Sequence, residues 1–231
     1  MRECAEGEGF EREEPAGDAS ADDGSDAEAF GGGGLAGDQV ERDLTGAELG
    51  GSVFEQVTFE RCVLRGADLT DVVTRGCRFD SCDLSGADLS GSSHHGSTFT
   101  NTRFVGARLS TTTFDGCKLT GSDLTETALL GVVMTGGDWS YVNLRGAVLR
   151  DRDLRGLRLA HADLSEADLT GTDLRGADLT GAVLRRTVLQ GTRLGDARLE
   201  GVALHDALLA GVEIDLAGAV RLAESLGAEV V

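Results

Sequence analysis

Apolar residues recur at every fifth position along most of this chain. The pattern begins at Leu44 and continues without an insertion or deletion to Ile214. Of its 35 positions, only Thr74 and His94 are not apolar. The residue two places before each apolar position is nearly always small, as at Ala67, and glycine is the commonest residue two places after it. An internal repeat that covers most of a chain decides the fold before any single element is considered.

A period of five is incompatible with the two common secondary structures. Five residues of an α-helix turn through ~500°, so successive apolar side chains would spiral around the axis. On a continuous strand, alternate apolar side chains would point to opposite faces. The pattern instead predicts short extended segments, each followed by a corner, with the apolar residue and the small residue two before it both pointing inward. Glycine at the corner suits a backbone with positive φ.

The sequence also indicates how many segments close one coil. Phe59, Phe79 and Phe99 lie 20 residues apart, and Thr74 and His94 are separated by the same interval. If four segments form a coil, the phenylalanines stack in one column and the two polar exceptions become neighbours. The 35 segments then give about nine coils, a rod on the order of 40 Å long at the spacing of β-strands. The predicted fold is an all-β quadrilateral helix over residues 41–214.

The last residues, 215–231, are predicted to form a C-terminal helix. Asp215 is a good N-cap, and Gly227 is placed to end the helix. The helix is more apolar than one covered stripe requires, so two alternatives stay open: it caps the last coil, or it caps the coil and also pairs with a second copy. The candidate residues for capping and dimerisation are Leu216, Val220, Leu222, Ala223 and Leu226.

Charge divides the chain unevenly. Residues 1–40 contain twelve acidic residues and two arginines, a net charge of -10. The formal net charge of the whole chain is -19. This segment is rich in glycine and alanine and is nearly free of bulky apolar residues, which predicts a disordered acidic tail. An acidic chain disfavours direct binding to nucleic acid, because each phosphate contact needs a cation.

Neither a targeting segment nor a membrane span is expected. The first residues are acidic and lack the apolar core of a signal peptide, which makes a cytoplasmic location the expectation. Four cysteines fall at the small inward position and are interpreted as core thiols: Cys62, Cys77, Cys82 and Cys117. Cys62 and Cys82 lie one coil apart, within reach of a disulfide, but free thiols are expected in a reducing compartment.

No motif for catalysis, metal binding or a cofactor is recognisable, and a filled β-helix offers no pocket for a substrate. His94 is the one histidine at an inward site of the repeat. A hydrogen bond to Thr74 or to the backbone is the expected role of this imidazole. We therefore expect a protein that is not an enzyme.

The triplets Ala67-Asp68-Leu69 and Ala87-Asp88-Leu89 match the A(D/N)Lxx signature, so the chain resembles the pentapeptide-repeat family over residues 44–214. This resemblance implies a right-handed quadrilateral β-helix. Shorter stretches resemble the mycobacterial fluoroquinolone-resistance subfamily, at residues 82–86, 92–99, 143–146, 153–157 and 214–227. The subfamily resemblance implies a non-enzymatic homodimer that mimics duplex DNA and binds DNA gyrase, and the apolar residues of the C-terminal helix make this helix the expected dimer contact.

Mimicry of DNA requires closely spaced surface carboxylates. B-DNA carries one charge per ~1.7 Å of axis, whereas one column of acids at strand spacing supplies one per ~4.8 Å, so two adjoining parts of the surface must contribute. The candidate carboxylates are Asp43, Glu48, Asp68, Asp71, Asp83 and Asp88.

Two observations favour other interpretations. An aspartate just before the central leucine can bond the backbone of its own turn, which is a structural role. The column of Glu48, Asp68 and Asp88 ends at Arg108, and arginines interrupt the acidic pattern of the C-terminal half. The alternative function is a pentapeptide-repeat scaffold for some other protein partner.

Overall fold

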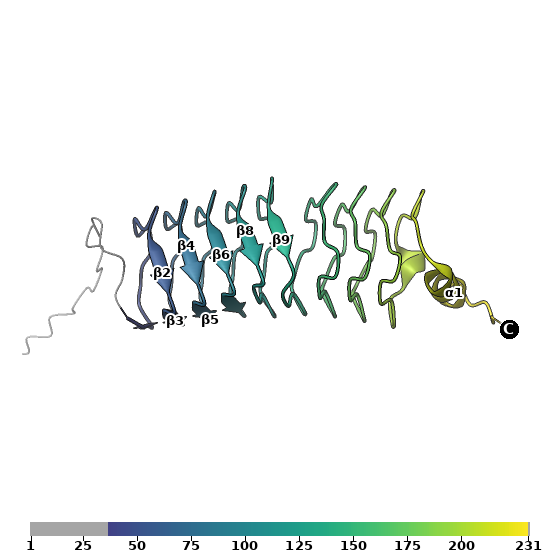
Figure 1. Ribbon diagram of the computed structural model, residues 1–231, viewed down its shortest axis with the longest axis horizontal. Helices are drawn as coiled ribbons and strands as arrows, with labels where there is room; N and C mark the ends of the chain where they lie inside the picture. Colours follow the sequence, from purple (N-terminus) through teal and green to yellow (C-terminus); the bar gives the residue numbers. More distant parts are fainter. Residues whose placement is uncertain (1–36, 231) are drawn as a thin grey trace, which may run out of the picture.

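The computed structural model describes residues 37–230, which form a rod of stacked coils closed by one helix (Figure 1). Most of the predicted acidic tail, residues 1–36, lies outside the described residues. The strands are β1 (Gln39–Val40), β2 (Val53–Glu55), β3 (Thr58–Glu60), β4 (Val73–Arg75), β5 (Arg78–Asp80), β6 (Ser93–His95), β7 (Thr98–Thr100), β8 (Thr113–Asp115) and β9 (Val133–Thr135). The helices are the 3-10 helix η1 (Leu204–Asp206) and the α-helix α1 (Leu216–Ser225).

Each coil contains 20 residues, as the spacing of the phenylalanines predicts. The strands pair in parallel in two sheets, in the orders β1-β3-β5-β7 and β2-β4-β6-β8-β9. The first pair aligns Gln39 with Phe59, and isolated bridges carry the same register as far as Arg193 with Glu213. The predicted fold class, a quadrilateral β-helix with a short C-terminal helix, is confirmed.

The interior is filled by the two inward residues of each segment. The rings of Phe59 and Phe79 stack with centroids 4.6 Å apart, and those of Phe79 and Phe99 with centroids 4.7 Å apart. The four inward cysteines are buried free thiols. Corners adopt the left-handed backbone that glycine favours, as at Gly66 with φ 60°. The predicted separation of inward and outward positions is therefore confirmed.

The two polar exceptions form one buried network. Thr74 pairs with His94 across β4 and β6, and the Thr74 hydroxyl lies 2.8 Å from His94 Nδ1. His94 Nε2 lies 3.0 Å from the Ser92 hydroxyl, which donates to the Leu89 carbonyl. Because the Ser92 hydroxyl already donates its one proton to the Leu89 carbonyl, it accepts a hydrogen bond from His94 Nε2–H. His94 Nδ1 then accepts from the Thr74 hydroxyl. The expected hydrogen bond between His94 and Thr74 is confirmed.

This buried imidazole predicts a loss of stability in acid. Burial, with a smaller contribution from His95, lowers the pKa of His94 to about 3, whereas histidine in an unfolded chain titrates near ~6.5. Below pH ~6.5 the unfolded chain therefore binds a proton that the folded chain does not, and the free energy of unfolding falls as the pH decreases. From pH 7 to pH 5, the free energy of unfolding measured with denaturant should fall by about 2 kcal/mol more for the wild type than for His94→Phe. Equal pH dependence of the two proteins would contradict the assignment.

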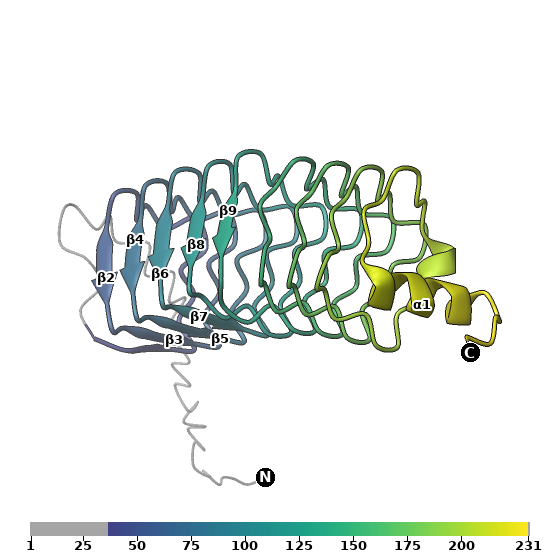
Figure 2. The ribbon, with the colours of Figure 1, turned by 45° about the vertical axis from the view of Figure 1, so that its right-hand side comes forward.

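The C-terminal helix lies across the end of the coils (Figure 2). The predicted N-cap is confirmed: Asp215 Oδ1 accepts a hydrogen bond of 2.7 Å from the Gly218 N–H. Its Oδ2 accepts from the Asp196 N–H at 2.8 Å, which ties the start of α1 to the last complete coil. Leu222 packs against the core. Helix α1 therefore covers backbone and apolar surface that the end of the β-helix would expose.

The stacking of coils is interrupted after β9, which the unbroken five-residue period does not predict. In the described chain, no backbone hydrogen bond joins residues 126–136 to residues 145–157, and β9 is the last strand of its sheet. The coils are visibly more separated there (Figure 1). Arg152 occupies the small inward position before Leu154, and it is the only charged residue at such a position between residues 47 and 212. Its bulk explains why the two coils do not close.

Candidate functional site

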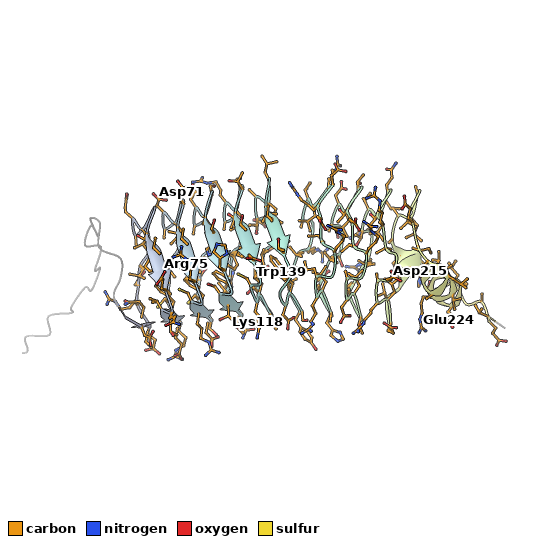
Figure 3. The ribbon with its side chains drawn as sticks, in the orientation of Figure 1. Asp71, Arg75, Lys118, Trp139, Asp215 and Glu224 are labelled. Carbon is orange, nitrogen blue, oxygen red and sulfur yellow. The ribbon has the colours of Figure 1, made fainter. Side chains whose placement is uncertain are left out.

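The predicted carboxylates gather on the first coils of the rod. The parallel bridges of Glu48 with Asp68 and of Asp68 with Asp88 place these three residues in one column. The bridges from Asp43 through Val63 to Asp83 form the column on the neighbouring face. Asp71 stands at the corner beside the first column, at the outer edge of the rod (Figure 3). All six candidate carboxylates therefore lie on adjoining faces and corners, as the sequence predicted.

The aspartates also take part in the turns, as the alternative interpretation expects. Asp68 Oδ1 accepts hydrogen bonds from the N–H of Thr70 at 2.9 Å and from its hydroxyl at 2.7 Å. Asp43 makes the same pair of bonds with Thr45, and the Thr45 hydroxyl is the main reason that the pKa of Asp43 lies below its ordinary value. These bonds fix one oxygen of each carboxylate in the turn. The structural and functional interpretations are therefore compatible, because the same carboxylate has a second oxygen.

Arginines use that second oxygen at two of the six positions. Asp83 Oδ2 accepts from Arg65 Nε at 2.6 Å, and Asp88 Oδ2 accepts from Arg108 Nη2 at 2.8 Å. Burial alone would raise the pKa of Asp88, but the Arg108 guanidinium and the Ser90 hydroxyl bring it below its ordinary value. Both carboxylates are ionised, but their charge is largely balanced locally.

Four carboxylates of the described chain make no ion-pair contact, although after the Thr45 hydrogen bonds the Arg65 guanidinium also helps to keep the pKa of Asp43 below its ordinary value. Within residues 37–230, no ion pair joins Asp43, Glu48, Asp68 or Asp71 to an arginine or lysine. Asp43, Glu48 and Asp71 are exposed, and Asp68 is half-buried. We call these four residues the acidic surface. It covers only the first two coils, which is a smaller area than the six sequence candidates define.

The C-terminal half has a different character. Its carboxylates are mostly engaged by arginines, in the pairs Arg145–Glu166, Arg150–Asp168, Arg155–Asp153, Arg158–Asp138, Arg175–Asp173 and Arg198–Asp178. The arginine-rich composition of this half thus produces a surface of paired charges, and the anionic strip does not continue along the rod.

Helix α1 presents a second candidate surface. Leu216 and Leu226 are 82% and 69% exposed, while Val220, Leu222 and Ala223 are half-buried. The five residues that the sequence groups together therefore divide into those that cap the rod and those that face outward. Leu216 and Leu226 provide the apolar surface that a second copy would cover.

A cavity of about 440 Å³ lies at the interruption after β9. Its lining residues are Glu126, Thr127, Ala128, Leu129, Leu130, Gly146, Ala147, Val148, Arg150 and Arg152. The expectation that a filled β-helix offers no pocket is wrong at this interruption, where the coils do not close on each other. The signal that could have revealed it is Arg152, a long charged residue where the repeat requires a small one.

Comparisons with known proteins agree with this architecture. The family model described as pentapeptide repeats matches the chain in eight overlapping copies between residues 43 and 201. No curated protein sequence matches. In the described residues, no helix has the length and apolar character needed to cross a membrane.

Solved structures of QnrB1, named as a plasmid-mediated fluoroquinolone resistance protein, have the same fold. The full-length QnrB1 structure has a TM-score of 0.72 and 22% sequence identity, over 83% of this chain and 97% of that one. A trypsin-treated variant has a TM-score of 0.73 and 23% identity, over 85% of this chain and 98% of that one.

Proposed function

We propose, from the premise that this chain belongs to the pentapeptide-repeat family, that it is a non-catalytic protein that binds DNA gyrase in place of duplex DNA. Binding would inhibit the enzyme or protect it from quinolone-class poisons. The proposal requires that the chain share the cytoplasm with gyrase. Support comes from the similarity in fold to QnrB1, a fluoroquinolone resistance protein, and from the acidic surface.

The acidic surface is the observation that carries the proposal. Each of the first two coils contributes two carboxylates, Asp43 with Glu48 and Asp68 with Asp71. Two charges per coil at ~4.8 Å correspond to one charge per ~2.4 Å, which approaches the one per ~1.7 Å of B-DNA. The turn hydrogen bonds of Asp43 and Asp68 hold these charges in fixed positions, so a partner would meet a preorganised pattern.

Reversal of this charge should weaken the effect on gyrase. We expect Glu48→Lys combined with Asp71→Lys to raise the concentration needed for half-maximal inhibition or protection by about tenfold, because a cationic groove for DNA would repel the new lysines. The measurement is gyrase supercoiling with and without a fluoroquinolone.

The matched control changes charge by the same amount in the C-terminal half, at Asp151→Lys combined with Asp196→Lys. Asp71 and Asp151 share a left-handed backbone, with φ 54° and 57°, and each packs its Oδ1 against the glycine of the next coil, Gly91 and Gly171. Equal effects of the two double variants would show that the acidic surface has no specific part in the interaction with gyrase. Absence of any effect or binding of the wild type at micromolar concentration would refute the proposal.

Dimerisation through α1 is the second part of the proposal. A dimer would double the length of the rod and cover Leu216 and Leu226. We expect the wild type to be a dimer by light scattering and Leu216→Glu combined with Leu226→Glu to be a monomer. Because both side chains are exposed in one chain, the variant monomer should keep its stability within about 0.5 kcal/mol. A wild type that is already monomeric would contradict this part.

A scaffold for a different protein is the alternative function. The paired charges of the C-terminal half favour it, because a surface of arginine–carboxylate pairs does not resemble DNA along its whole length. Gyrase inhibition that is unaffected by salt and by reversal of the acidic surface would favour this alternative, since mimicry of DNA depends on charge.

A further inference from the structure

The interruption of coil stacking after β9 leaves a cavity between two neighbouring coils. Two backbone hydrogen bonds flank it: Leu124 N–H donates to the Asn143 carbonyl at 2.9 Å on one side, and Trp139 N–H donates to the Arg158 carbonyl at 2.8 Å on the other. Between these hydrogen bonds the two coils stay apart, and the cavity of about 440 Å³ opens between residues 126–130 and residues 146–152. Its volume lies within the range of ~300–1,000 Å³ that small-molecule sites occupy.

The walls of the cavity are mainly apolar. Ala128, Leu129 and Leu130 line one side, and Ala147 and Val148 line the other. Leu130 is 75% exposed and Val148 is 61% exposed, so the apolar walls are accessible from outside. A ligand that removes these side chains from water would gain from the hydrophobic effect.

Arg152 supplies a polar group that lacks a partner. Its Nε is buried and, in the described part of the protein, makes no hydrogen bond. A buried charged donor is unfavourable unless an acceptor reaches it. The neighbouring Arg150 is already engaged, because its Nε donates to Asp168 Oδ2 at 2.6 Å. Arg152 is therefore the cationic group of this cavity that is available to a ligand.

We propose that this cavity binds a small amphipathic monocarboxylate, with its hydrocarbon or aryl group against the apolar walls and its carboxylate on Arg152. The planar guanidinium binds a carboxylate or a phosphate through two parallel hydrogen bonds, and of these two a carboxylate carries the single negative charge. Glu126, which is exposed in the lining, disfavours a second negative charge on the ligand. This site is independent of the acidic surface and of the proposed binding of gyrase.

The position of Arg152 in the repeat connects the site to the fold. A small residue stands at the same inward position in nearly every other segment, where the coils close on each other. The arginine thus both holds the coils apart and provides the group that the ligand contacts. Bulk and charge can be separated by substitution: Arg152→Met keeps most of the length without the charge, and Arg152→Ser restores the small residue of the repeat.

Octanoate and 1-octanol are the probes, titrated by calorimetry into the full chain. We expect the wild type to bind octanoate, Arg152→Met to bind it at least about tenfold more weakly with unchanged binding of 1-octanol, and Arg152→Ser to bind neither, because the coils close. Arg103→Met, at an exposed arginine of the N-terminal half, is the control that should bind both as the wild type does. Unchanged affinity of Arg152→Met for octanoate would overturn the proposal.

Amide hydrogen exchange of the wild type, with and without octanoate, tests the proposal even if a variant does not fold. Octanoate should slow amide hydrogen exchange at Leu129, Gly131 and Val148, whose N–H groups border the interruption, and leave Leu64 and Leu84 unchanged. Failure to bind octanoate at millimolar concentration, or uniform slowing along the rod, would overturn the proposal. The proposal would also be overturned if a blocked tripeptide of valine, glutamate and valine bound while octanoate did not. The cavity would then be a binding site for a segment of a protein.

Discussion

Leu164→Asp is expected to abolish folding of the C-terminal coils. Leu164 is fully buried and has a coil on either side, so an aspartate there can reach neither water nor a cation. Burial of an unpaired charge costs several kcal/mol even when the carboxyl is neutralised, and the removal of the leucine side chain adds about 2–5 kcal/mol. The total is comparable with the whole stability of a typical domain, about 5–15 kcal/mol. Circular dichroism and thermal melting should show loss of the cooperative transition.

The matched control is Val183→Asp. Val183 forms a bridge with Asp163, immediately before Leu164, but it is 46% exposed. A new carboxylate at this outward position stays hydrated, and the change in stability should be within about 0.5 kcal/mol. Equal melting of Leu164→Asp and the wild type would show that the central leucine of the repeat does not point inward.

Gly137→Ala is expected to be the most damaging of the conservative substitutions. A Cβ at Gly137 would lie 1.9 Å from the carbonyl oxygen of Cys117 and 2.9 Å from its carbon. These are backbone atoms of the preceding coil, which cannot move without breaking its hydrogen bonds. The residue also has φ 89°, where alanine is strained. We expect a loss of more than about 2 kcal/mol in the free energy of unfolding, measured by denaturant titration.

Gly136→Ala is the control for this prediction. Gly136 has φ 62°, but a Cβ there would meet no atom within 4 Å. The Gly136→Ala variant therefore loses only the stability that alanine costs in the left-handed backbone, about 1 kcal/mol. If the two variants lost the same stability, the close approach of the coils at Gly137 would have no energetic consequence.

The acidic surface shows where inference from the sequence stops. The 20-residue register placed Glu48, Asp68 and Asp88 in one column, and the structure confirms that column. The register does not reveal which of these charges remain unpaired. That depends on where long arginine side chains reach, as from Arg65 to Asp83, 18 residues away. The choice among several partners of similar energy is decided by rotamers and packing on the surface.

The sequence by itself determined the architecture, because a five-residue period without insertions is compatible with one repeated geometry. Inward and outward positions, the stacked phenylalanines and the pair of Thr74 with His94 all follow from that geometry. Only the tertiary structure decided where the geometry fails, at Arg152, and which side chains of α1 stay exposed. A repeat specifies the average coil, whereas a break depends on whether the neighbouring coils can accommodate one oversized side chain, and that is a property of packing in three dimensions.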